Sequence, residues 1–239
     1  MTLMIGTSGW AFKEWRPGFY PADLPQSRWL EHYCRHLTAC EINATFYRKQ
    51  APATFEKWAA AAPKSFRFAA KAHRVITHSR MFAPDENRRA VIGDFFESIS
   101  ALGELRGPVL FQFPASRERD DAALAGLLDA VPDGVPCAFE FLSQTWDEDA
   151  VTDLLLEHGM TRCFTDREGD APEKLPPGPI AYVRMRTQRY TDGQMERWRA
   201  LFDSESATRD VYVFTKHEGT APEDPHGGIG LSRWLIERA

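Results

Sequence analysis

Short apolar runs alternate along this chain with segments whose apolar residues recur at helical spacing. The first run ends at Gly9 and passes into a loop rich in aromatic residues. Because an edge strand would expose its apolar side chains, we expect this first strand to lie in the middle of a sheet. Further strands are predicted at residues 39–47, 66–72, 109–114, 137–141, 162–166, 180–185 and 211–215. Helices are predicted between them at residues 27–37, 53–62, 87–104, 121–131, 148–158, 192–202 and 231–239.

This alternation of strands and helices predicts a parallel sheet covered by helices. Eight such units within 239 residues predict an α/β fold with one domain over residues 1–239, a closed parallel (β/α)8 TIM barrel. The sixth crossover is rich in proline and glycine without a helical period, so we expect no helix there. An open doubly wound sheet is the alternative fold. Such sheets often carry a glycine-rich phosphate turn, and neither G-x-G-x-x-G nor G-x-x-x-x-G-K occurs in this sequence.

Polar residues fall at the ends of the predicted strands, where barrel enzymes place their chemistry. Those expected to face the barrel interior or its rim are Ser8, Glu41, Asn43, Lys71, Gln112, Glu140, Asp166 and Arg184. Those expected to face the helices instead are Ile42, Ala70, Phe111, Phe139 and Val183. A charge inside a barrel is costly unless it is paired. Three acids and two bases at one mouth therefore indicate an active site or, alternatively, a structural salt-bridge network.

If the mouth is an active site, the catalytic candidates are Glu41, Lys71, Glu140 and Asp166. Paired carboxylates can act as general acid and base when their surroundings separate their pKa values, which favours Glu140 or Asp166 in those roles. Lys71 and Arg184 would hold an anionic group, and Lys71 could instead form a Schiff base. The residues expected to bind substrate are Ser8, Trp10, Asn43, Tyr47, Gln112, Arg184, Arg186 and Lys216.

The charge of the chain favours a small ligand over a polyanion. Its 29 Lys and Arg against 34 Asp and Glu give a net charge of −5, which argues against indiscriminate binding to nucleic acid. Loops at the predicted catalytic end are nevertheless rich in basic and aromatic residues, a pattern typical of a face for an anionic ligand or a nucleic-acid strand. The basic ones are Lys13, Arg16, Arg48, Lys49, Arg74, Arg80, Arg117, Arg119, Arg167, Arg186, Arg189 and Lys216. The aromatic ones are Trp10, Trp15, Tyr20, Phe46, Tyr47, Phe82 and Tyr190.

Cysteine and histidine usage indicates neither a disulfide framework nor a metal site. The four cysteines, Cys34, Cys40, Cys137 and Cys163, include no C-x-x-C pair, and we interpret them as reduced core residues of a cytoplasmic protein. His73, His78 and His217 show no metal-binding spacing, so we expect no metal and no cofactor. No run reaches the roughly 18 apolar residues of a membrane span, and the first residues lack the features of a signal peptide.

The sequence resembles the YecE-like family, bacterial proteins of unknown function with a TIM-barrel fold. The matching stretches are residues 6–10 (GTSGW), 19–21 (FYP), 41–47 (EINATFY), 68–71 (FAAK), 77–78 (TH), 111–114 (FQFP), 139–140 (FE), 182–184 (YVR) and 219–222 (GTAP). They run nearly from end to end. The resemblance implies the barrel but no established reaction.

Three rim positions depart from the pattern typical of that family. Leu142 and Ser143 stand in place of Arg-His, Arg186 and Thr187 in place of His-Gly, and Thr215 and Lys216 in place of Asn-Asn. We therefore expect a different substrate or a lost activity. The favoured function is hydrolysis or isomerisation of a phosphorylated or otherwise anionic small molecule. The alternatives are a nucleic-acid-binding barrel of endonuclease-like layout and a scaffold with a degenerate site, and the sequence predicts no particular protein partner.

Overall fold

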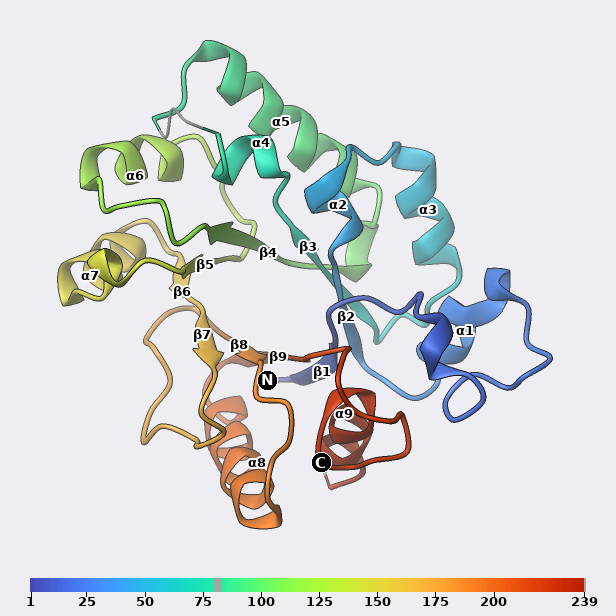
Figure 1. Ribbon diagram of the computed structural model, residues 1–239. Helices are drawn as coiled ribbons and strands as arrows, with labels where there is room; N and C mark the ends of the chain where they lie inside the picture. The colour runs from blue at the N-terminus through green and yellow to red at the C-terminus, as the bar shows by residue number, and fades with distance from the viewer. Residues whose placement is uncertain (80–82, 239) are drawn as a thin grey trace.

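Nine parallel strands form one sheet in the part of the chain, residues 1–79 and 83–238, that the computed structural model describes (Figure 1). They are β1 (Leu3–Thr7), β2 (Ala39–Ile42), β3 (Arg67–Lys71), β4 (Arg106–Phe113), β5 (Cys137–Phe141), β6 (Thr161–Arg162), β7 (Phe164–Asp166), β8 (Ile180–Met185) and β9 (Asp210–Thr215). Their order across the sheet is β6-β5-β4-β3-β2-β1-β9-β8-β7. The first strand is central, as predicted.

The two ends of this sheet meet, because β6 and β7 are consecutive pieces of the sixth predicted strand. Only Cys163 separates them; β6 pairs with β5, and β7 pairs with β8. The Cys163 N–H still donates to the Phe139 carbonyl at 2.9 Å, whereas on the β8 side the Thr161 hydroxyl, 3.1 Å from the Ile180 carbonyl, replaces a backbone bond. The strands thus follow one another around a nearly closed ring, and the predicted TIM barrel is confirmed.

Helices surround the ring on its outer side (Figure 1). They are α1 (Trp29–Tyr33), α2 (Ala44–Tyr47), α3 (Pro52–Ala60), α4 (Arg74–Thr77), α5 (Glu86–Ser100), α6 (Asp121–Leu128), α7 (Asp149–Glu157), α8 (Asp192–Ser206) and α9 (Gly228–Glu237). Short 3-10 turns lie at residues 13–15, 26–28, 103–105 and 144–146. No helix occurs between β7 and β8, as the proline-rich crossover predicted.

Several predicted boundaries were wrong by three to five residues, and two of them have clear local reasons. The second strand ends at Ile42 rather than 47, since Asn43 takes helical dihedral angles and the Thr45 hydroxyl donates to the Ile42 carbonyl at 2.8 Å, turning the chain into α2. The first helix ends at Tyr33 rather than 37. Beyond it the His36 N–H bonds the Tyr33 carbonyl three residues back, so the chain leaves the α-helical pattern.

Side chains alternate between the barrel interior and the helices. The interior cluster consists of Met4, Ala39, Ala69, Leu110, Ala138, Cys163, Ile180, Tyr182, Tyr212 and Phe214. The residues predicted to face the helices lie in the two other clusters, with Ile42, Ala70, Phe111 and Phe139 in one and Val183 in the second. This alternation is what carries polar residues at the strand ends into the mouth.

Gly6 allows β1 and β2 to approach closely. A side-chain carbon there would lie 1.8 Å from the Ala39 carbonyl oxygen, so no other residue fits. Tyr33 of α1 completes the ladder at this point: its hydroxyl accepts from the Thr7 N–H at 2.8 Å and donates to the Ala39 carbonyl at 3.0 Å. The first strand, the first helix and the second strand are therefore joined by one buried side chain.

Candidate active site at the carboxyl end of the barrel

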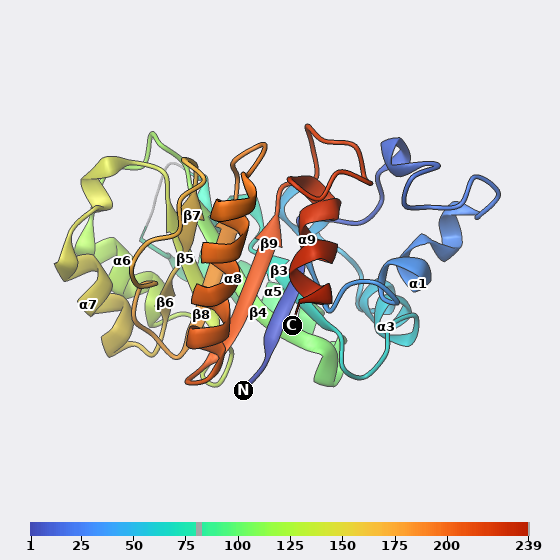
Figure 2. The same ribbon diagram turned by 90° about the horizontal axis from the view of Figure 1, so that it is seen from below.

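The loops that follow the strands gather at one end of the barrel, as the loop after β9 shows in the side view (Figure 2). Five polar residues enter this end because each lies two positions after an interior apolar residue of its strand. They are Glu41 after Ala39, Lys71 after Ala69, Gln112 after Leu110, Glu140 after Ala138, and Arg184 after Tyr182. The structure thus brings these five predicted residues into one cluster.

Arg184 joins the two glutamates of the cluster. Its Nη1 lies 2.6 Å from Glu140 Oε2, and its Nη2 lies 2.9 Å from Glu41 Oε1. Burial would raise the pKa of Glu41, but the charges of Arg184 and Arg186 outweigh it and lower that pKa to about 2. The pKa of Arg184 is raised, since the two carboxylates outweigh its own burial. All three groups are therefore charged at neutral pH.

Glu140 is held by two further donors. Gln112 Nε2 and Thr165 Oγ1 each lie 2.6 Å from one of its carboxylate oxygens. Burial opposes ionisation, but Arg184 and these hydrogen bonds lower the pKa of Glu140. Sequence reasoning missed Thr165; the signal was available, because Thr165 lies two positions after the interior residue Cys163.

Lys71 differs from the other charges because it forms no ion pair with a carboxylate among the described residues. Its Nζ donates to Gln112 Oε1 at 2.7 Å and lies 4.3 Å from the centre of the Phe46 ring. The side chain is 8% exposed. Burial, together with the charge of Arg184, lowers the pKa of Lys71 to about 8. This amine can therefore change its protonation near neutral pH.

Arg186 and Ser8 extend the cluster toward the rim. Arg186 Nη2 donates to Ser8 Oγ at 2.7 Å and lies 3.6 Å from Glu41 Oε1, while Ser8 Oγ donates to that same oxygen at 2.7 Å. Asn43 Nδ2 donates to the Ser8 carbonyl at 3.1 Å. Burial lowers the pKa of Arg186, and Arg184 adds to this effect. Arg186, a departure from the family pattern, is thus built into the cluster.

Asp166 is not brought to the cluster, contrary to the predicted convergence of three acids. Thr165 takes the inward position, so the next residue faces the other side of the strand. Asp166 Oδ1 accepts from the backbone N–H groups of Glu168 at 3.2 Å and Gly169 at 2.8 Å, and the Tyr190 hydroxyl donates to Oδ2. These contacts fix the start of the sixth crossover, and a catalytic role for Asp166 stays untested.

Three other predicted residues lie outside the ionic cluster. Trp10 packs edge-on against Trp58, with ring centres 5.1 Å apart. Tyr47 is 67% exposed at the end of α2. The Lys216 backbone N–H donates to the Met185 carbonyl at 3.0 Å, directly after β9. Their roles in substrate binding stay predictions.

Some of the basic and aromatic loop residues are buried or already paired within the protein. Trp15 and Tyr20 are 1% and 0% exposed, so they pack in the helix-side core and offer no free face for stacking. Arg119 pairs with Asp121 at 2.7 Å, and Arg189 pairs with Asp224. Fewer basic and aromatic side chains are therefore free to contact a nucleic acid than the sequence suggested. Arg80 and Phe82, counted in that face, lie outside the described residues.

Two cavities touch the edges of the cluster. One of about 400 Å³ is lined by Glu140 and Thr165 together with the β5 and β7 loops. Another of about 270 Å³ is lined by Ser8, Trp10 and Asn43. A pocket centred on the whole cluster stays a prediction. Over the described residues, no group of three or more His, Cys, Asp or Glu side chains could hold a metal ion, and no helix is long and apolar enough to cross a membrane.

The comparison with known sequences decides the family. The model of a protein family of unknown function, DUF72, matches residues 4–226. The chain belongs to this family. YunF of Bacillus subtilis, a UPF0759 protein, is 28% identical over 149 residues, which are 60% of this chain and 52% of YunF. The match thus spans about half the length of that relative. The membership inferred from the sequence motifs is confirmed under the DUF72 description.

Solved structures of DUF72 proteins share the fold. The protein from Thermotoga maritima superposes with a TM-score of 0.79 at 21% identity, over 100% of this chain and 99% of that one. The protein from Enterococcus faecalis gives 0.75 at 15% identity, over 99% and 94%. A D-psicose 3-epimerase determined with D-fructose gives 0.51 at 14% identity, over 98% and 90%. Likeness at these identities shows the TIM-barrel fold alone.

Proposed function

We propose that this DUF72 protein is an enzyme of hydrolase or isomerase type that acts on a phosphorylated or otherwise anionic small molecule at the barrel mouth. The observation that carries the proposal is the excess of positive charge in the buried cluster. Among the described residues, the cluster holds three cationic side chains, Lys71, Arg184 and Arg186, against the two carboxylates of Glu41 and Glu140. An anionic ligand would balance that excess where water is scarce and charge-assisted hydrogen bonds are strong.

Within this proposal Lys71 is the group that moves a proton. Burial, followed by the charge of Arg184, lowers its pKa to about 8, which suits transfer near neutral pH. Glu140 carries a lowered pKa and is ionised, so it serves as a base or as an electrostatic partner and not as an acid. In a covalent alternative, Lys71 would instead form a Schiff base with the substrate.

Arg184 and Arg186 would bind the anionic group. The Nε atom of Arg184 is buried and has no acceptor within the described chain, and a substrate oxygen would satisfy it. Ser8, Asn43 and Gln112 then position the charged groups rather than react, since each donates or accepts inside the cluster. Trp10, Tyr47 and Lys216 are proposed substrate contacts on the rim.

The competing functions have less support. A nucleic-acid-binding barrel would need several free stacking aromatics, but Trp15 and Tyr20 are buried even though Tyr47 is exposed. Lys71 is buried in the described cluster without an ion-pair partner. A scaffold with a degenerate site would have no need for such an arrangement. A cytoplasmic location belongs to the proposal, since all four cysteines are free and buried.

The test is a thermal-shift screen with phosphorylated and carboxylated metabolites, followed by mass-spectrometric detection of product from each compound that binds. The proposal expects at least one compound to raise the melting temperature and to be turned over. The Lys71→Met and Glu140→Gln variants should lose that turnover, whereas Lys64→Met, at an exposed lysine, should keep it. Full turnover by both cluster variants would end the assignment.

A further inference from the structure

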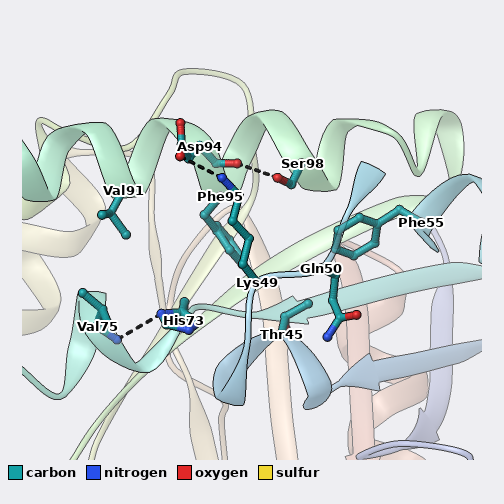
Figure 3. Close-up of a pocket in the computed structure, with 10 residues that line it drawn as sticks. All are labelled: Thr45, Lys49, Gln50, Phe55, His73, Val75, Val91, Asp94, Phe95 and Ser98. Atoms are coloured by element: carbon teal, nitrogen blue, oxygen red, sulfur yellow. Dashed lines mark hydrogen bonds and ion pairs between the residues drawn. The ribbon is translucent and has the colours of Figure 1, made fainter. Parts of the chain in front are cut away.

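A second cavity lies on the outer side of the barrel, beneath α5 and beside α3 and α4 (Figure 3). Its volume is about 190 Å³. None of the charged residues of the barrel mouth lines it, so it is separate from the proposed active site.

The walls of this cavity are mainly apolar. Phe55 comes from α3 and Val75 from α4, and Figure 3 shows Val91 and Phe95 of α5 pointing down from the helix, Val91 on the side of Val75 and Phe95 beside Lys49. Phe55 and Phe95 are buried, at 1% and 8% exposure, so the walls are part of the packed core. An apolar cavity of about 150 Å³ is known to hold a single aromatic ring, and this one is of comparable size.

The polar atoms around the cavity are mostly satisfied inside the protein. Ser98 Oγ donates to the Asp94 carbonyl at 2.8 Å, and Thr45 Oγ1 donates to the Lys71 carbonyl at 2.7 Å. Lys49 Nζ pairs with Asp94 Oδ2 at 2.8 Å across the edge of the cavity. These two opposite charges cancel, so the edge offers no net charge to a ligand. A charged ligand would lose its hydration without compensation.

His73 places a hydrogen-bond donor on the wall of the cavity. The Val75 backbone N–H donates to His73 Nδ1 at 3.3 Å. Burial, with a contribution from Arg74, lowers the pKa of His73, so the ring is neutral near pH 7. A neutral ring that accepts at Nδ1 carries its proton on Nε2, which can donate to a ligand.

We propose that this cavity binds a small uncharged molecule consisting of one aromatic ring and one hydroxyl group, whose oxygen is the hydrogen-bond acceptor, with phenol as its simplest form. The ring would lie among Phe55, Val91 and Phe95, and the acceptor would face His73. This inference does not depend on the chemistry proposed for the barrel mouth.

The experiment is a titration of the isotope-labelled full chain with phenol, toluene and benzoate, followed by amide NMR shifts. Phenol should give saturable shifts at Val75, Val91 and Phe95. It should bind roughly fivefold more tightly than toluene, which cannot accept from His73. Benzoate should bind more weakly than phenol, because its charge would be desolvated.

Variants that fill the cavity test whether phenol binds there. Val91→Phe fills the cavity from α5 and should abolish the phenol shifts, and Val75→Phe fills it from the partly exposed helix α4, which keeps the test valid if the first variant misfolds. Glu97→Phe puts the same ring on the exposed face of α5 and should leave binding intact. Absence of saturable shifts, shifts confined to other residues, or unchanged binding in the filled variants would overturn the proposal. Equal affinity for phenol and toluene would overturn the role of His73.

Discussion

At the scale of single residues, Arg184 holds the buried charges of the mouth together, because it is the only described ion-pair partner of Glu140. Removing the Glu140 charge should therefore leave a buried guanidinium only partly compensated. We expect Glu140→Gln to lower the free energy of unfolding by about 3 kcal/mol. Urea denaturation measures this, with Glu97→Gln on an exposed position of α5 as the control. A loss no larger than that of the control would show that the Arg184–Glu140 ion pair contributes little to stability.

Lys71 should give the protein a characteristic dependence on pH. Its pKa is about 8 when folded and 10.5 in its ordinary state, so between these values the unfolded chain binds more protons than the folded one. The contribution of Lys71 to the free energy of unfolding therefore rises by up to about 3 kcal/mol as the pH increases from 8 to 10.5. The difference in unfolding free energy between the parent and Lys71→Met, measured at both pH values, isolates the effect. An unchanged difference would contradict the lowered pKa.

Most of the cluster could be predicted from the sequence, since a period of two within each strand places Glu41, Lys71 and Glu140 inward once the barrel is assumed. Asp166 was assigned inward because it is the acidic residue at the end of the sixth strand, whereas Thr165 is the residue two positions after the interior Cys163. A shift of one residue turns every side chain to the opposite face, so choosing Asp166 in place of Thr165 reversed the orientation of this strand end.

At the scale of elements, Tyr33 joins β1, α1 and β2. Tyr33→Phe would leave the buried Thr7 N–H and Ala39 carbonyl without their shared partner. We expect it to lower the free energy of unfolding by about 2 kcal/mol, measured by urea denaturation. Tyr47→Phe, at a side chain that is 67% exposed, is the matched control and should change little. Equal effects from both substitutions would refute this role for Tyr33.

The short helices α2 and α4 were the elements that the sequence did not reveal. Each has four residues, too few to show a helical period, and each depends on a side-chain bond to the backbone. In α2 the bond comes from Thr45, and in α4 the cap is His73. Both helices nevertheless contribute to the two proposed sites, since α2 places Phe46 over Lys71 and α4 forms a wall of the cavity beneath α5.

At the scale of the whole molecule, the barrel followed from the repeated strand and helix pattern and from the family motifs. The reaction did not, because one fold supports many activities and the DUF72 description names none. The excess positive charge inside the mouth is a property of the assembled barrel, since the charged residues come from β2, β3, β5, β8 and the residue after β8. That charge, rather than any single motif, supports the proposed anionic substrate.

The most direct test of this central claim is calorimetric titration of the parent and of Lys71→Met with the strongest anionic compound from the thermal-shift screen, at low and at high salt. We predict one binding site with a shallow salt dependence, weakened at least tenfold in Lys71→Met, because without Lys71 the cluster loses the excess positive charge that the anion balances. The contrary result would be equal affinity in both proteins. So would preferential binding of an oligonucleotide whose affinity falls steeply with salt and does not depend on Lys71.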